Sequence, residues 1–114
     1  MRKWVVAVVA LMGASMAQAA ELDVSHCKYP EPPEVPDGAN ASEAEMGQSG
    51  AAVRQFVADV ESSLQCLTTV EESLGDEITE EQQATLVAMY NQGVDRMNAV
   101  VENYNAQVKA YRGE

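Results

Sequence analysis

The residues best suited to chemistry in this sequence are a single histidine and two cysteines. Thiolates and imidazoles are zinc ligands, so His26, Cys27 and Cys66 could together bind a metal ion. Adjacent residues such as His26 and Cys27 rarely face one ion, however, and no fourth ligand is apparent. Two cysteines permit only one pairing. We therefore predict a Cys27–Cys66 disulfide, no metal site and no cofactor.

The groups that enzymes combine are missing from the sequence. A nucleophilic serine needs a base within hydrogen-bond reach, and Ser62, Ser63 and Ser73 have no histidine at helical spacing. The chain also lacks a glycine-rich phosphate loop. We therefore expect a protein that is not an enzyme.

Acidic side chains dominate the charge, because 18 Asp and Glu against 7 Lys and Arg give a formal net charge of −11. Nucleic acids and anionic membrane surfaces attract basic patches, so neither is an expected partner. One acidic cluster could bind a cation or a basic protein, although it lacks the ordered spacing of a calcium loop. Solvated charge is the simpler interpretation. The cluster comprises Glu71, Glu72, Asp76, Glu77, Glu80 and Glu81.

Tyrosine and asparagine recur together near the end of the sequence. Pairs that start at 90, 97 and 104 each place an asparagine directly after a tyrosine or a methionine. The amides could grip the backbone of an extended segment, either of this chain or of a partner. The alternative, solvated positions beside a helical seam, is favoured by the usual polarity of flanking heptad positions. The candidate protein-contact residues are Tyr90, Asn91, Asn98, Tyr104, Asn105 and Tyr111.

Residues 1–19 have the pattern of a cleaved signal peptide. Arg2 and Lys3 precede an apolar run over 4–16, and an Ala-Gln-Ala site ends at Ala19. The run of about 13 residues is shorter than the roughly 20 that a membrane span needs. We predict cleavage after Ala19, a periplasmic or secreted protein, and no stable membrane insertion afterwards. Loss of Arg2 and Lys3 would make the net charge more negative by two.

Residues 20–41 are predicted to form an extended arm. All four prolines lie in this segment, between 30 and 36. Proline cannot continue a helix and favours polyproline-like extension. Asp37-Gly38 then indicates a turn into the next element.

A helix is predicted over about 43–74. Ser42 and Glu45 have the spacing of a capping box, and Gly75 marks a plausible end. Apolar or small residues alternate at steps of four and three, which places them on one face. This seam comprises Met46, Gly50, Val53, Val57, Val60, Leu64, Leu67 and Leu74, and a flank beside it comprises Ser49, Phe56, Ser63 and Val70.

A second helix is predicted over about 80–111, after a capping box at Thr79 and Gln82. Because the connection is short, the helices should be antiparallel, which makes residues 42–114 an all-α hairpin. Gly50 could make room for a tyrosine ring of the second helix. The predicted seam comprises Val87, Val94, Val101 and Val108 together with Tyr90, Met97, Tyr104 and Tyr111.

The disulfide tests this architecture. Cys66 should lie roughly 36 Å along the first helix from its N-terminal cap. The arm between Cys27 and that cap can extend about 46 Å in polyproline geometry. The arm must therefore run nearly straight back along the first helix, where we expect Tyr29 and Val35 to pack beside Phe56.

Three stretches of the chain carry a resemblance: CKYPEPPEVPDGANASEAEM, FVADVESSLQCL and TEEQQATLVAMYNQGVDRMNAVVENYNAQVKAY. They resemble a group of small secreted proteobacterial helical-hairpin proteins to which no activity is attached. That group shares a Cys-x-x-Pro arm, a Pro-Asp-Gly turn, a Ser-x-x-Glu-Met helix start and a second cysteine in the first helix. The resemblance implies export and the arm-and-hairpin architecture.

A shorter motif bears on function. Ile78-Thr79-Glu80-Glu81-Gln82 is similar to the Leu-Thr-x-x-Gln motif of the periplasmic stress proteins related to Spy and CpxP. Those proteins are helical ATP-independent chaperones, so the similarity implies binding of unfolded envelope proteins. The chain has one copy, with isoleucine in place of leucine, and the motif also meets the needs of a helix cap.

These observations favour a non-enzymatic exported protein with a structural or protein-binding role in the cell envelope. Its protein partner is not identified by the sequence, and a homodimer that pairs two hairpins into a four-helix bundle is one arrangement. A small periplasmic chaperone and a cation-binding protein that uses the acidic hairpin tip are the alternatives.

Overall fold

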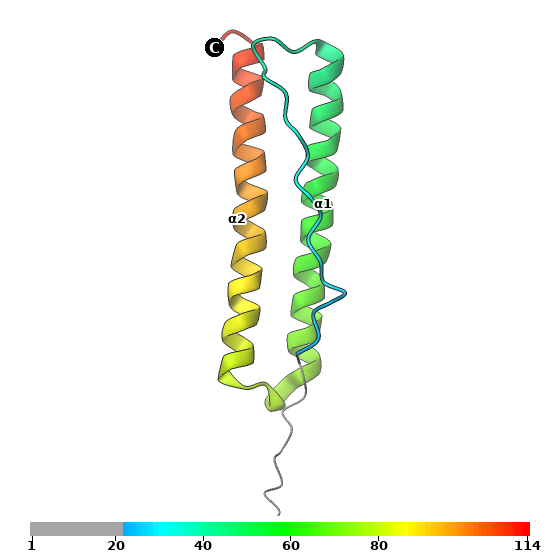
Figure 1. Cartoon of the computed structure of the whole chain (residues 1–114), viewed down its shortest axis with the longest axis vertical. Coiled ribbons are helices and arrows are strands. Elements are labelled where there is room, and N and C mark those ends of the chain that lie inside the picture. The colour runs from blue at the N-terminus through cyan, green and yellow to red at the C-terminus, as the bar shows by residue number, and fades with distance from the viewer. Residues whose placement is uncertain (1–21) are drawn as a thin grey trace, which may run out of the picture.

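Figure 1 shows a computed structural model of the chain, in which residues 22–114 are described. Two antiparallel helices of 32 residues each lie side by side: α1 spans Glu43–Leu74 and α2 spans Glu80–Tyr111. A short 3-10 helix, η1 (Gly75–Glu77), connects them. The predicted all-α hairpin is therefore confirmed, and the expected signal peptide at 1–19 lies outside the described residues. Of the helices described, neither is long and apolar enough to cross a membrane.

The helices begin at the caps that the sequence predicts. Ser42 Oγ accepts a hydrogen bond from the Glu45 backbone N–H at 3.1 Å, which is one half of the predicted box. At α2 the box is complete, because Thr79 Oγ1 and Gln82 Oε1 each accept from the other's backbone N–H at 3.0 Å. Gly75 ends α1 with a φ of 51°, a conformation that favours glycine.

The extended arm, residues 22–41, lies in front of the two helices in Figure 1 and runs back along α1. Two turns shape it, with backbone hydrogen bonds from Cys27 N to Val24 O (2.9 Å) and from Asn40 N to Asp37 O (3.1 Å). The second turn lies at the open end of the hairpin and leads into α1, as predicted.

The arm widens the buried face of α1. Val60 and Leu64 of the predicted seam form a cluster against which α2 residues such as Val94 pack. The flank beside the seam is buried as well, and the arm reaches it at Ser63, which bonds to the Lys28 carbonyl. Val60 is fully buried, whereas Val57, also predicted in the seam, is only half-buried. The buried residues of α1 are Met46, Ser49, Gly50, Val53, Phe56, Val60, Ser63, Leu64, Leu67 and Val70.

The predicted seam of α2 is wrong in part. Val87 is 51% exposed and Tyr90 is 42% exposed, whereas the buried residues of α2 are Leu86 and Gly93. Successive helix residues are about 100° apart, so the buried stripe is turned toward the flank of α2 that the arm covers. Within residues 22–114, no third element lies against the opposite flank, which carries Val87 and Tyr90.

Candidate functional site

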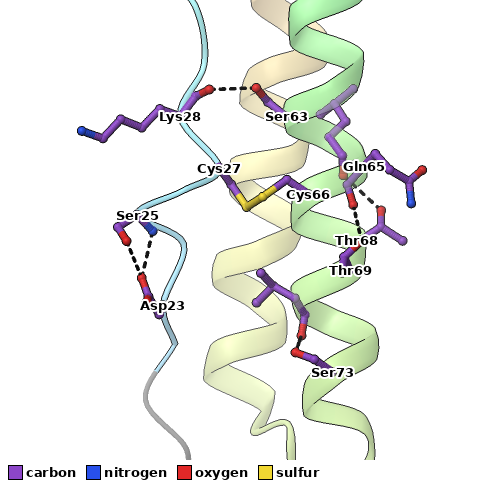
Figure 2. Close-up of a disulfide and its surroundings, with 12 residues drawn as sticks. Asp23, Ser25, Cys27, Lys28, Ser63, Gln65, Cys66, Thr68, Thr69 and Ser73 are labelled. Atoms are coloured by element: carbon purple, nitrogen blue, oxygen red, sulfur yellow. Dashed lines mark hydrogen bonds between the residues drawn. A yellow bond between two sulfur atoms is a disulfide. The ribbon is translucent and has the colours of Figure 1, made fainter.

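The arm is tied to α1 by a disulfide between Cys27 and Cys66, which confirms the predicted pairing (Figure 2). Their Cα atoms are 5.5 Å apart, which is within the usual range. Cys27 is 2% exposed and belongs to a core cluster with Leu67, Val70 and Leu86. We call this disulfide the clasp.

The turn before the clasp is also ordered by hydrogen bonds. The Asp23 carboxylate accepts from the Ser25 hydroxyl (2.7 Å) and from the Ser25 backbone N–H (3.0 Å). These bonds lower the pKa of Asp23, with the hydroxyl as the largest cause. Together with the Cys27–Val24 backbone bond, they fix the conformation of the chain around His26.

Polar groups hold the arm directly after the clasp. Ser63 Oγ donates to the Lys28 backbone carbonyl at 2.8 Å (Figure 2). The Tyr29 hydroxyl donates to the Met89 carbonyl of α2. The arm is therefore bonded to both helices within two residues.

The ring of Tyr29 lies over Gly93 of α2. A Cβ atom at Gly93 would lie 2.5 Å from three atoms of this ring, so only glycine allows the observed approach. The Arg96 guanidinium carbon is 5.9 Å from the ring centroid, within cation–π range. Burial raises the pKa of the Tyr29 phenol, and the nearby Arg96 charge opposes this shift. Tyr29 also packs against the core cluster of Phe56, Val60 and Leu64, the part of α1 where the sequence predicted it.

A second contact holds the far end of the arm. The Gly38 N–H donates to Gln107 Oε1 of α2 at 2.9 Å. A Cβ at Gly38 would lie 1.8 Å from the Gln107 backbone oxygen, so the two backbones are in direct contact. Val35, the other arm residue expected to pack, is half-buried and lines a shallow hollow with Ser49 and Ala52.

The residues that hydrogen-bond to the backbone of the arm were not predicted from the sequence. Asn91, Asn98 and Asn105 are all exposed, and among the described residues none of them hydrogen-bonds to the arm. Ser63 and Gln107 bond to its backbone instead. Two signals in the sequence could have identified them. The first is Gly93, because a glycine inside a helix costs about 1 kcal/mol relative to alanine and often marks a close approach of another segment. The second is that Gln107 lies on the heptad line of Gly93, the glycine that receives Tyr29.

The flank of α2 away from the arm forms an open groove with α1. Val87 lies nine residues from Arg96, which is about 180° around the helix. The groove has a volume of about 250 Å³. Its lining residues are Leu67, Thr68, Glu71, Leu86, Val87, Tyr90 and Asn91.

The candidate contact residues divide between the groove and other places. Tyr90 and Asn91 lie together in the groove. Tyr104 instead packs on Gly50, where an added Cβ would lie 2.5 Å from its hydroxyl, as expected for a glycine that makes room for a ring. Tyr111 is 42% exposed at the far end of α2.

The surroundings of the groove are acidic. No Lys or Arg occurs between Arg54 and Arg96, and the six tip carboxylates predicted as a cluster are all exposed. Over residues 22–114, the tip acids are not among the groups with metal-ligand spacing, whereas His26, Cys27 and Cys66 form one.

No protein-family model matches the chain, and neither does any curated protein or solved structure.

Proposed function

We propose that this protein is a non-enzymatic exported protein of the cell envelope that binds a cationic amphipathic helix in its open groove. The observation that carries the proposal is an apolar groove that none of the described residues covers, between helix segments that contain no Lys or Arg from residue 55 to residue 95. Export is supported by the signal-peptide pattern at 1–19 and by the clasp, because disulfides persist in oxidising compartments.

The shape of the groove suits a helix. Two antiparallel helices leave a channel along their junction, and a third helix can place an apolar stripe in it. Val87 and Tyr90 are about half exposed and would lose water contact on binding. Removing apolar area from water is favourable by about 25 cal/mol per Å², and part of this gain offsets the entropy lost on association. Tyrosine is enriched among the residues that dominate binding energy.

The charge of the groove selects the partner. Glu71 lines it, and the acidic tip is next to it in the sequence. Positive side chains along the rim of a bound helix would be attracted, which raises the association rate and disfavours acidic competitors. A second copy of this chain would bring its own negative charge, which is −11 for the full sequence and more negative after loss of Arg2 and Lys3, so a basic partner is favoured over a homodimer.

A designed peptide tests the proposal. A fluorescent helix-forming peptide, with leucine on one face and lysine on the other, is titrated with the protein and followed by anisotropy. We expect binding that weakens with added salt, because salt screens charges between exposed groups. Tyr90→Ser should weaken it about tenfold, which corresponds to 1.4 kcal/mol. Tyr111→Ser is the matched control, since both tyrosines are 42% exposed, and it should bind as the unmodified protein does.

Two outcomes contradict the proposal. One is an equal loss of affinity for Tyr90→Ser and Tyr111→Ser, since the groove would then not be the binding site. The other is equal binding of a peptide in which every lysine is replaced by glutamate, since charge would then play no part.

A chaperone is the second candidate, because the same exposed Val87 and Tyr90 could hold unfolded chains. It differs in its selectivity: a chaperone at stoichiometric amounts should suppress aggregation of a denatured client whatever the client's charge. Suppression limited to basic clients supports the cationic-helix proposal instead.

A further inference from the structure

The clasp brings three metal-ligand groups to one place. The nitrogen of His26 and the sulfurs of Cys27 and Cys66 all lie within 4.8 Å of one another. The sequence argument against such a site was that adjacent residues rarely face one ion. Here the ligand atoms of His26 and Cys27 do lie close together. The reason is a turn, closed by the hydrogen bond from Cys27 N to Val24 O, which folds the chain back immediately before Cys27.

We propose that the clasp becomes a zinc site when a dithiol reductant opens the disulfide. The dithiol gives two electrons and two protons to the Cys27–Cys66 bond and becomes a disulfide itself. Each resulting thiol then loses its proton as its sulfur binds Zn²⁺, and neutral His26 supplies the third ligand. The fourth position of the ion is left to water, as in three-ligand zinc sites of other proteins.

The dimensions of the group suit this ion. Zinc binds thiolate sulfur at about 2.3 Å and imidazole nitrogen at about 2.0–2.1 Å in tetrahedral geometry. These bonds place the ligand atoms roughly 3.5–3.8 Å apart. All three ligand atoms already lie within 4.8 Å, so a small separation of the sulfurs after reduction is sufficient.

Other contacts keep the ligands together once the sulfur bond is open. Lys28, next to Cys27, is held to α1 by its bond from Ser63. Tyr29 is held to α2 by its bond to Met89 and by its seat over Gly93. Cys27 is thereby retained beside Cys66 without a covalent link. His26 is exposed and Cys66 half-buried, so an ion can enter from solvent.

The site is tested with the metal alone. The protein is reduced with a dithiol, freed of reductant without oxygen, and titrated with Co²⁺, whose visible spectrum reports thiolate ligation. Zn²⁺ is then added in competition. We expect one tightly bound ion per reduced chain and none for the oxidised chain. The titration is carried out at about 15 °C, near the stability maximum of small domains.

Substitutions identify the ligands. His26→Ala should weaken binding at least about tenfold, because even residues that only orient a ligand contribute that much. Lys28→Ala is the control: it changes the other exposed neighbour of Cys27 and should leave binding unchanged. Cys66→Ser should abolish the thiolate bands of two-sulfur ligation.

Three results would each overturn the proposal. The first is a reduced, helical protein that binds Co²⁺ no better than the oxidised form. The second is unchanged affinity in His26→Ala. The third is loss of helical circular dichroism on reduction before metal is added, because the site requires the arm to stay in place.

Discussion

Gly93 is the residue at which the arm and α2 come closest. In Gly93→Ala, the new Cβ would lie 2.5 Å from the Tyr29 ring, so the ring must move. Overpacking of this kind costs about 1–3 kcal/mol, and the better helix propensity of alanine offsets only about 1 kcal/mol. We expect a lower free energy of unfolding in urea.

Gly47 supplies the matched control for this substitution. It also lies inside a helix, but a Cβ there meets nothing within 4 Å. Gly47→Ala should therefore stabilise the protein by about 0.5–1 kcal/mol. If the two alanine variants are equally stabilised, the close packing of the Tyr29 ring on Gly93 does not contribute to stability.

We expect alanine substitutions at two buried serines of α1 to change stability in different ways. Ser63, 7% exposed, donates to the Lys28 carbonyl. The hydroxyl of Ser49, 6% exposed, is buried and has no hydrogen-bond partner among residues 22–114. Ser63→Ala should cost about 1–3 kcal/mol, since a carbonyl of the arm loses its donor. Ser49→Ala removes an unsatisfied group and should be neutral or stabilising. Thermal melts of the two variants, compared with the unmodified protein, check this order.

Tyr29 makes stability depend on pH at the alkaline end. Its folded-state pKa is raised above the usual 10.0, first by burial. The folded state therefore disfavours the phenolate, and this contribution is fully present below about pH 10 and lost as pH rises through the folded pKa. The free energy of unfolding should fall more steeply above pH 10 in the unmodified protein than in Tyr29→Phe. Equal slopes in urea unfolding at several pH values would count against the buried hydroxyl.

At the scale of the elements, the clasp links the whole arm to α1. Closing a loop of about 40 residues contributes about 4 kcal/mol in the chain-entropy model. Small domains have total stabilities of about 5–15 kcal/mol, so the double variant Cys27→Ser, Cys66→Ser should still fold but unfold at much lower urea. A change of under about 1 kcal/mol would show that the arm is held by its polar contacts alone.

The elements themselves could be predicted from local signals. Ser42, Thr79 and Gly75 mark helix ends by hydrogen bonding and backbone conformation, both of which depend on neighbouring residues alone. The prolines of the arm and the two cysteines constrain its path, because they limit its length and straightness.

The rotation of α2 could not be predicted in the same way. Val87 and Leu86 are both apolar, and which one is buried depends on the side of the hairpin that the arm covers. Heptad periodicity indicates which residues of a helix face another helix. It does not indicate which residues an extended segment such as the arm covers. The open groove follows from that rotation, which is why Tyr90 was expected in the seam and is found half exposed.

At the scale of the whole molecule, the negative net charge should favour binding of a basic partner and disfavour dimerisation. The negative net charge, −11 for the full sequence, attracts a basic helix to the groove and repels a second copy of the chain. At about 1 M salt the screening length falls to about 3 Å, so both effects are largely removed.

We therefore predict that sedimentation shows a monomer in low salt at pH 7, while binding of the lysine peptide is then strongest. Raising the salt at constant pH should weaken peptide binding and allow two grooves to pair through Val87 and Tyr90, since apolar contacts are not screened. Val87→Ser combined with Tyr90→Ser should suppress the high-salt dimer, and Tyr111→Ser should not. A dimer that is strongest in low salt would mean that the groove is filled by another copy of the chain, and the partner would then need no positive charge.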